Sequence, residues 1–160
     1  MSKAYKTQWV GQYAVASELT RRDYLVSMPL GNAPNLDLQC QSQNTEKRFA
    51  VQAKSLNSKG FFLMQAKFLE RKNPTPNLYF VFVYLPRDES KHLEYFVLSH
   101  KQLLSKVWKE VKWDKRRREK ERRKRGLKHW KIKGWEGTHG INYKFLNTKA
   151  YRNKWKNLPH

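Results

Sequence analysis

Three polar side chains, those of Asp37, Gln52 and Lys54, are spaced so that they meet at one point of a predicted β-hairpin. Residues 36–40 and 49–54 each alternate apolar and polar side chains, as half-buried strands do. Antiparallel pairing of these two strands sets Asp37 opposite Gln52 and directs all three polar side chains to one face. A carboxylate, a carboxamide and an ammonium group in one place could hold a divalent cation and orient a water molecule for hydrolysis.

The opposite face of this hairpin is apolar. The turn is predicted at Asn44 and Thr45, in a polar stretch that joins the two strands. With this register the apolar side chains share the buried face, and they are Leu36, Leu38, Cys40, Val51 and Ala53. Polar groups beside such a core are costly unless they have partners or a use.

A helix is predicted before the hairpin, from Trp9 to Arg21. Its expected packing stripe consists of Val10, Tyr13, Ala14 and Ser17. Glu18 follows at the edge of this stripe, where it could face the hairpin. The alternative is an ordinary ion pair between Glu18 and Arg22 at the i, i+4 spacing. Residues 24–28 read as the first strand.

The rest of the chain predicts a central mixed sheet flanked by helices. Residues 78–85 are eight apolar or aromatic residues in a row, typical of a strand covered on both faces. Residues 94–98 form the next strand, and Ser99 with Gln102 has the spacing of a helix-capping box. The stretch 61–69 fits a strand or a helix equally well, and a closing helix is expected at about 147–157, with Tyr151 and Trp155 as its buried pair.

The charge of the chain is extreme and uneven. The 160 residues carry a formal net charge of +21, and residues 101–160 hold 21 Lys and Arg against 5 Asp and Glu. A basic half of this kind indicates a polyanionic partner, most commonly nucleic acid. One cysteine excludes an intramolecular disulfide framework, and no apolar stretch is long enough to cross a membrane. We expect a single domain, 1–160.

A basic insert at about 113–126 interrupts this domain. Nine of the eleven residues from 115 to 125 are Lys or Arg, without an apolar face, so the segment is expected to contact phosphates. The predicted nucleic-acid-binding residues are Lys115, Arg116, Arg117, Arg118, Lys120, Arg122, Arg123, Lys124, Arg125 and Lys128.

The hairpin resembles the PD-(D/E)xK nuclease superfamily, which includes restriction endonucleases, Holliday-junction resolvases and some homing endonucleases. Asn35-Leu36-Asp37 stands where the family has its Pro-Asp motif, Gln52-Ala53-Lys54 stands for (D/E)xK, and Glu18 stands for the acid of the preceding helix. The resemblance implies a restriction-endonuclease-like α/β (α+β) core with an αβββαβ-like order.

The resemblance also implies roles for these residues in cutting DNA. Asp37, Gln52 and Glu18 would be the ligands of Mg²⁺, with Mn²⁺ as a substitute, and Lys54 would act on the attacking water. Glu18, Asp37, Gln52 and Lys54 would therefore be the catalytic set. Gln52 is a neutral ligand, so we expect weaker metal binding than in a site with a second strand carboxylate.

Other readings of the same residues remain open. Gln52 could mark a non-catalytic nucleic-acid-binding protein with the same fold, and the charge also suits a basic RNA-binding protein. For the nuclease we expect DNA as the partner, a homodimer with two-fold symmetry for duplex cutting, no membrane and no small-molecule substrate. The expected location is the cytoplasm, at the bacterial nucleoid.

Overall fold

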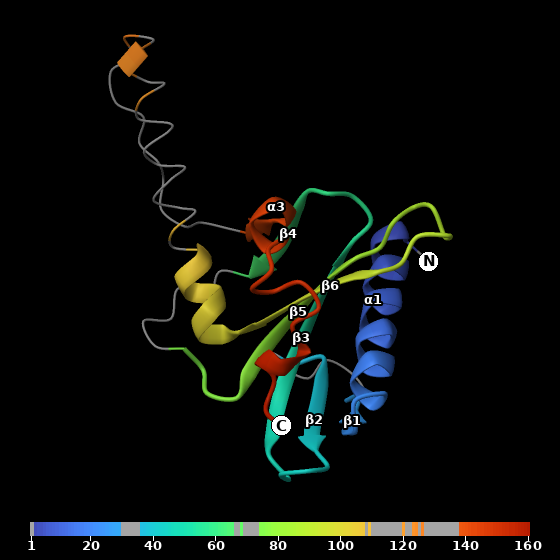
Figure 1. Cartoon of the computed structure of the whole chain (residues 1–160). Coiled ribbons are helices and arrows are strands. Elements are labelled where there is room, and N and C mark those ends of the chain that lie inside the picture. Colours follow the sequence, from blue (N-terminus) through green and yellow to red (C-terminus); the bar gives the residue numbers. More distant parts are fainter. Residues whose placement is uncertain are drawn as a thin grey trace.

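The fold is built on a five-stranded mixed sheet (Figure 1). The computed structural model describes residues 2–29, 36–65, 68, 74–107, 109, 120, 123–124, 126 and 138–160. The strands lie in the order β1-β2-β3-β5-β6, with bounds Tyr24–Ser27, Leu38–Ser42, Arg48–Leu56, Leu78–Tyr84 and Glu94–Ser99. Only β3 and β5 run parallel among these neighbours. The predicted mixed sheet with flanking helices is confirmed.

Helix α1, Lys3–Thr20, precedes the sheet and packs on one of its faces. It begins earlier than predicted, because the Ser2 hydroxyl accepts a hydrogen bond from the Tyr5 amide and caps the first turn. Its buried face contains Gly11, Val15 and Leu19, not the predicted stripe around Val10 and Tyr13. The helix is therefore rotated from the orientation that its apolar pattern indicates.

Gly11 explains this rotation. A Cβ atom on Gly11 would lie 2.4 Å from the Cβ of Ser55 in β3, so only glycine fits at this crossing. The Ser55 hydroxyl also donates a hydrogen bond of 2.8 Å to the carbonyl of Thr7. Close contact between the backbones of α1 and β3 thus overrides the weak amphipathic pattern of the helix.

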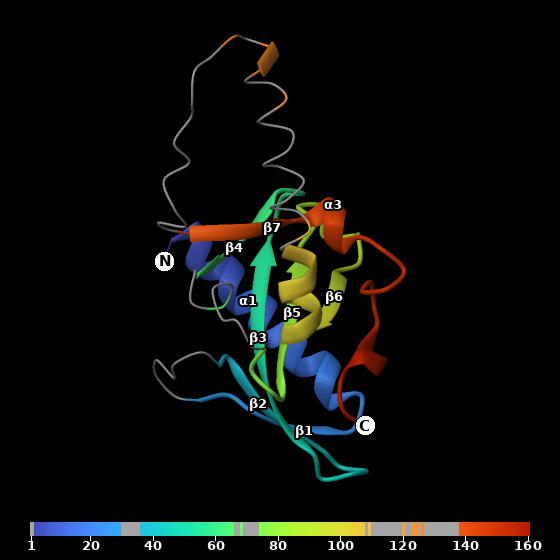
Figure 2. The ribbon, with the colours of Figure 1, turned by 90° about the vertical axis from the view of Figure 1, so that its left-hand side faces the viewer.

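The two faces of the sheet are covered by different layers, as Figure 2 shows. On the α1 side, Val15 and Leu19 pack against strand residues that include Leu38 and Val51. On the other side lie the helical segment 100–107 and the strand pair β4–β7, over Phe80 and Phe82. Because β5 contributes to both clusters, its eight-residue apolar run is accounted for, and the predicted central strand is confirmed.

Strands β4, Phe61–Gln65, and β7, Thr138–Asn142, form a separate antiparallel pair. The structure resolves the open choice for 61–69 in favour of a strand at its start. Residues 138–140 belong to β7 although this part of the chain is rich in glycine. Gly140 permits this pairing, since a Cβ there would lie 2.8 Å from the carbonyl oxygen of Phe62.

The C-terminal region differs from the prediction of one helix at 147–157. It contains a short helix α3, Tyr143–Leu146, turns, and a 3-10 helix at Trp155–Asn157. Asn153 has a left-handed backbone (φ 52°) and its amide donates to the Tyr95 carbonyl of β6, which ends any continuous helix. As a result Tyr151 and Trp155 pack into different clusters and do not form the expected pair.

The predicted capping box at Ser99 is present. The Ser99 amide donates to the side-chain oxygen of Gln102 at 2.8 Å, and the Gln102 amide donates to the Ser99 hydroxyl at 3.2 Å. This reciprocal pair starts the helical segment 100–107 directly after β6. Among the described residues, no helix has both the length and the apolar character that crossing a bilayer requires.

Candidate active site

The β2–β3 pair has the predicted register. Leu38 lies opposite Val51 and Gln41 opposite Arg48, which sets Asp37, one residue before β2, opposite Gln52. The Asp37 amide continues the ladder by donating to the Val51 carbonyl at 3.0 Å. Four residues of the predicted apolar face, Leu38, Cys40, Val51 and Ala53, are buried in one cluster. Leu36, the fifth, is half-buried and lies before the start of β2.

The Asp37 carboxylate is held by two donors from β3. Its Oδ2 atom accepts a hydrogen bond from the side-chain amide of Gln52 and one of 2.8 Å from the backbone N–H of Ala53. Gln52 itself is only 5% exposed, so this contact lies in a poorly hydrated place. Two donors on one carboxylate oxygen hold the side chain in a single orientation.

Electrostatically, Asp37 is in an unfavourable position for its charge. Burial raises the pKa of this carboxyl, while the Lys54 ammonium, the Ala53 N–H and the Gln52 amide act in the opposite direction. Lys54 is therefore close enough for its charge to act on Asp37, as expected from its place two residues after Gln52. The structure brings together three of the four predicted catalytic residues, namely Asp37, Gln52 and Lys54.

Helix α1 supplies a further contact that the sequence did not indicate. The side-chain amide of Gln12 donates a hydrogen bond of 2.9 Å to the backbone carbonyl of Asp37. Gln12 sits next to Gly11, so the close approach of α1 to β3 also sets its position. The sequence pattern points to the acidic residue of the helix, Glu18, because an uncharged glutamine such as Gln12 carries no comparable signal.

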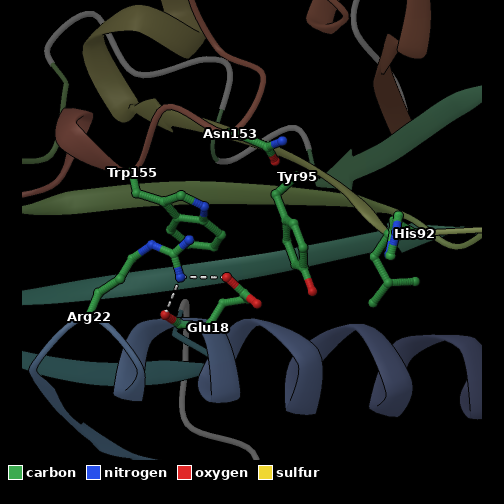
Figure 3. A pocket seen from close by; sticks show the side chains of 7 residues that line it. Glu18, Arg22, His92, Tyr95, Asn153 and Trp155 are labelled. Carbon is green, nitrogen blue, oxygen red and sulfur yellow. Dashed lines mark hydrogen bonds and ion pairs between the residues drawn. The ribbon is translucent and has the colours of Figure 1, made fainter.

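Glu18 is placed elsewhere, which corrects the expectation that it joins Asp37 and Gln52. Its carboxylate pairs with Arg21 at 2.9 Å and with Arg22, the i, i+4 partner of the alternative reading. Glu18 and Arg22 line an open pocket of about 450 Å³ together with Tyr95 and Trp155. Figure 3 shows Glu18 and Arg22 on the side of α1 that faces these two aromatic rings. Glu18 lies six positions after Gln12, which is about 9 Å further along α1 and on a different side of the helix, so Glu18 points away from Asp37.

The surroundings of Glu18 are those of a structural ion pair. The Arg22 guanidinium lies over the Trp155 ring, 4.5 Å from its centroid. Burial, followed by the nearby charge of Glu18, raises the pKa of Tyr95 to about 12, so its hydroxyl stays protonated. These contacts fasten the end of α1 to β6 and the C-terminal turn.

The oxygen atoms at Asp37 and Gln52 fit Mg²⁺ only when a phosphate completes its ligands. Mg²⁺ is commonly held by one or two carboxylates together with substrate phosphates and waters. Within the described residues, no three His, Cys, Asp or Glu side chains form a group that could hold a metal ion. Gln52 turns its NH₂ group to Asp37, so its amide would have to rotate before its oxygen could share a cation with that carboxylate.

Two other side chains of reactive types, those of Cys40 and His100, are buried in the core. Burial raises the pKa of the Cys40 thiol to about 12, which keeps it neutral and unreactive, as its strand position predicts. His100 is 1% exposed; its Nδ1 accepts from the Thr75 amide at 2.8 Å, and its Nε2 lies 2.8 Å from the Phe68 carbonyl oxygen. Neither side chain belongs to the Asp37 cluster.

Most of the predicted nucleic-acid-binding residues lie outside the described residues. These are Lys115, Arg116, Arg117, Arg118, Arg122, Arg125 and Lys128. Lys120, Arg123 and Lys124 are described and exposed. Their exposure is compatible with phosphate contact, and their role stays a prediction.

No protein-family model matches the chain, and no curated protein matches its sequence. A search of solved structures finds similarity to a bacterial homing endonuclease, I-Ssp6803I. The match has 19% identity and a TM-score of 0.44, and it covers 63% of this chain and 68% of that chain. At this identity and TM-score the likeness assigns neither a family nor an activity to this chain.

Proposed function

We propose that this chain is a metal-dependent DNA endonuclease of the PD-(D/E)xK type, with its reaction centre at Asp37, Gln52 and Lys54. The observation that supports the proposal is the hydrogen bond between Asp37 and Gln52 across β2 and β3, with the Lys54 charge near enough to act on Asp37. Asp37 is half-buried although burial disfavours its charge, and a carboxyl whose pKa is shifted by burial and by a nearby cation is typical of functional sites.

Each residue of this centre has a role that follows from its chemistry. Asp37 and the carboxamide oxygen of Gln52 would hold Mg²⁺ or Mn²⁺. When bound, such an ion polarises a phosphate and lowers the pKa of a water molecule. Lys54 would orient the attacking water or help remove its proton, and would stabilise the negative charge that builds on the phosphate oxygens. Glu18 is left out of the centre because its carboxylate is paired with Arg21 and Arg22.

The charge of the chain supports DNA as the partner. A net charge of +21 favours binding along a phosphate backbone and makes this binding strongly dependent on salt. The exposed side chains of Lys120, Arg123 and Lys124 are among the groups proposed to make these contacts.

Plasmid cleavage tests the proposal. Supercoiled DNA is incubated with Mg²⁺ or Mn²⁺ and the wild type, Asp37→Ala or Lys54→Ala. Asp88→Ala and Lys91→Ala serve as matched controls, because these residues form an exposed acid–base pair at 3.4 Å in a surface turn. We expect nicking by the wild type and the controls only. Cleavage that survives both Asp37→Ala and Lys54→Ala would remove the assigned centre.

Cutting both strands requires two such centres, for which we propose a symmetric homodimer. Linear product from a single binding event, together with a dimer in sedimentation, would support it. A monomer that only nicks would contradict the dimer without affecting the proposed centre.

A second candidate is a non-catalytic nucleic-acid-binding protein with the same fold. It is favoured by the single carboxylate, Asp37, in the described part of the centre. Tight DNA binding by a wild type that does not cleave under any metal condition would select this candidate. Preference for an RNA of equal length would instead select the RNA-binding alternative.

A further inference from the structure

Three aromatic side chains form a continuous stripe on the solvent side of α1. Tyr5, Trp9 and Tyr13 follow one another at four-residue intervals, so they lie on one side of the helix. The rings of Tyr5 and Trp9 meet edge to face at 5.9 Å between centroids, and those of Trp9 and Tyr13 stack at 5.4 Å. Tyr5 is 46% exposed and Tyr13 is 57% exposed. Trp9 between them is half-buried, and adjoining aromatic rings at a helix surface are a candidate interaction surface.

We propose that this aromatic stripe binds unpaired nucleotides of a nucleic acid through base stacking, beside the Asp37 centre. The inference rests on the proposed function, because it adds unpaired strands to the DNA that the proposed nuclease binds. Base–aromatic stacking is a general means of holding single strands, because every base has a flat face.

The position of the stripe connects it to the candidate active site. Trp9 and Gln12 are three residues apart and therefore adjacent on the helix surface. The Gln12 amide donates to the Asp37 carbonyl at 2.9 Å, so one residue links the stripe to Asp37. Through Gln12 the stripe is therefore joined to the backbone at the start of β2, where Asp37 lies.

The charge around the stripe suits a polyanion better than a second copy of this chain. Residues 2–17 contain no Asp or Glu, and exposed Lys6 lies three residues before Trp9 on the same surface. Two copies paired through this face would bring two chains of net charge +21 together without acidic groups from the stripe region to offset them. Phosphates of a nucleic acid would neutralise Lys6 instead.

The geometry of the rings favours unpaired bases over a duplex. A base between two rings needs about 7 Å between their planes, so the 5.4 and 5.9 Å centroid distances leave no room for insertion. Bases must therefore stack on the outer surfaces of the stripe. A duplex cannot do this along its length, because the flat faces of its bases are already stacked on one another. From Tyr5 to Tyr13 the helix rises about 12 Å, enough for about two or three nucleotides.

The test measures binding of labelled oligonucleotides by anisotropy in EDTA, so that cleavage plays no part. A single-stranded oligonucleotide and its duplex are compared for the wild type, Tyr13→Ala, Tyr13→Phe and Lys6→Gln. Leu25→Ala is the matched control, because Leu25 is 56% exposed on β1 and lies outside the stripe. Thermal unfolding verifies that each variant is folded.

We expect Tyr13→Ala to weaken single-strand binding about tenfold, with little effect on the duplex, whereas Tyr13→Phe and Leu25→Ala bind like the wild type. The slope of log affinity against log salt should be unchanged in Tyr13→Ala, because no charge is removed, and should fall by about 0.7 in Lys6→Gln.

The proposal is overturned if Tyr13→Ala binds single strands normally, or if it weakens single-strand and duplex binding equally. It is also overturned if the wild type is a dimer that Tyr13→Ala dissociates. Because EDTA prevents cleavage, binding can succeed here even if the proposed nuclease activity fails.

Discussion

Gln52 donates a hydrogen bond from its side-chain amide to the Asp37 carboxylate, across the antiparallel pair β2–β3. The two residues are 15 positions apart, and the turn between them sets the register that makes them meet. This contact stabilises a carboxylate that burial disfavours. The hydrogen bond also occupies the NH₂ end of Gln52, so the observed arrangement suits an ionised Asp37 that shares no cation with Gln52.

Replacing Asp37 by Asn should leave the fold at least as stable at neutral pH and abolish cleavage. Burial raises the pKa of Asp37. A carboxyl with a raised pKa favours folding when protonated, and this contribution is lost as the pH rises from its unfolded-state pKa through its folded-state pKa. Because Asn stays neutral, the stability of Asp37→Asn relative to the wild type should increase across that interval.

Thermal unfolding of both proteins across acidic and neutral pH measures this difference. About 1 kcal/mol corresponds to about 2–4 °C in a chain of this size. A relative stability of Asp37→Asn that declines with rising pH would contradict the assigned direction of the Asp37 pKa.

Replacing Lys54 by Met should raise the pKa of Asp37 further. The Lys54 ammonium is the largest of the influences that hold this pKa down, and Met keeps the length of the side chain without its charge. Carboxyl-carbon NMR titration of Asp37 measures the shift. Lys47→Met is the control, because Lys47 lies in the exposed turn of the hairpin and is not among the groups that act on Asp37. An unchanged Asp37 titration in Lys54→Met would separate Lys54 from the centre.

Replacing Glu18 by Gln should leave cleavage within about twofold of the wild type. The Glu18 carboxylate is bound to Arg21 and Arg22 and turned to Tyr95, so its loss affects the attachment of α1 rather than Asp37. Such ion pairs contribute about 0.2–1 kcal/mol to the free energy of unfolding. Parallel cleavage assays and melts measure both effects. Loss of cleavage in a fully folded Glu18→Gln would restore Glu18 to the catalytic set.

The hairpin could be predicted from the sequence because its pattern is local. Alternation of apolar and polar residues on either side of one short turn leaves a single register that buries Leu38 and Val51 together. The placement of Asp37 opposite Gln52 follows directly. The apolar run of β5 is equally decisive, since a strand buried on both faces needs no alternation.

The apolar pattern of α1 does not indicate how the helix is oriented, and therefore does not indicate which of its residues lies near Asp37. Apolar side chains surround α1 on more than one side, while the contact that decides its orientation is the absence of a side chain at Gly11. That contact turns Gln12 to the Asp37 carbonyl and Glu18 to Arg22. Close packing between backbones leaves no hydrophobic signal in a sequence, so the pattern of the helix points to Glu18 and not to Gln12 as the residue facing the hairpin.

Replacing Lys120 and Lys124 together by Gln should weaken duplex DNA binding more at low salt than at high salt. Both side chains are exposed, and each phosphate contact removed should lower the slope of log affinity against log salt by about 0.9. Titrations at several salt concentrations, in EDTA, measure this slope. Lys91→Gln is a suitable control, since Lys91 is exposed but paired with Asp88. A slope that matches the wild type would exclude these lysines from phosphate contact.

Replacing Gln52 by Glu should make the fold depend on a divalent cation. The new carboxylate would contact Asp37 directly, and two like charges in this poorly hydrated place destabilise each other unless a proton or a cation lies between them. Without metal, Gln52→Glu should therefore unfold at a lower temperature than the wild type at neutral pH. With Mg²⁺ present, a second charged oxygen ligand should give Gln52→Glu a larger stabilisation than the wild type, which reaches about 2.7 kcal/mol when the Mg²⁺ concentration is 100 times the Kd.

Gln52→Met controls for the loss of the amide, because it removes the hydrogen bond and adds neither charge nor ligand. If Mg²⁺ stabilises Gln52→Glu no more than Gln52→Met, the oxygens at these two positions do not face a shared cation, and the proposed centre would have to bind metal without Gln52.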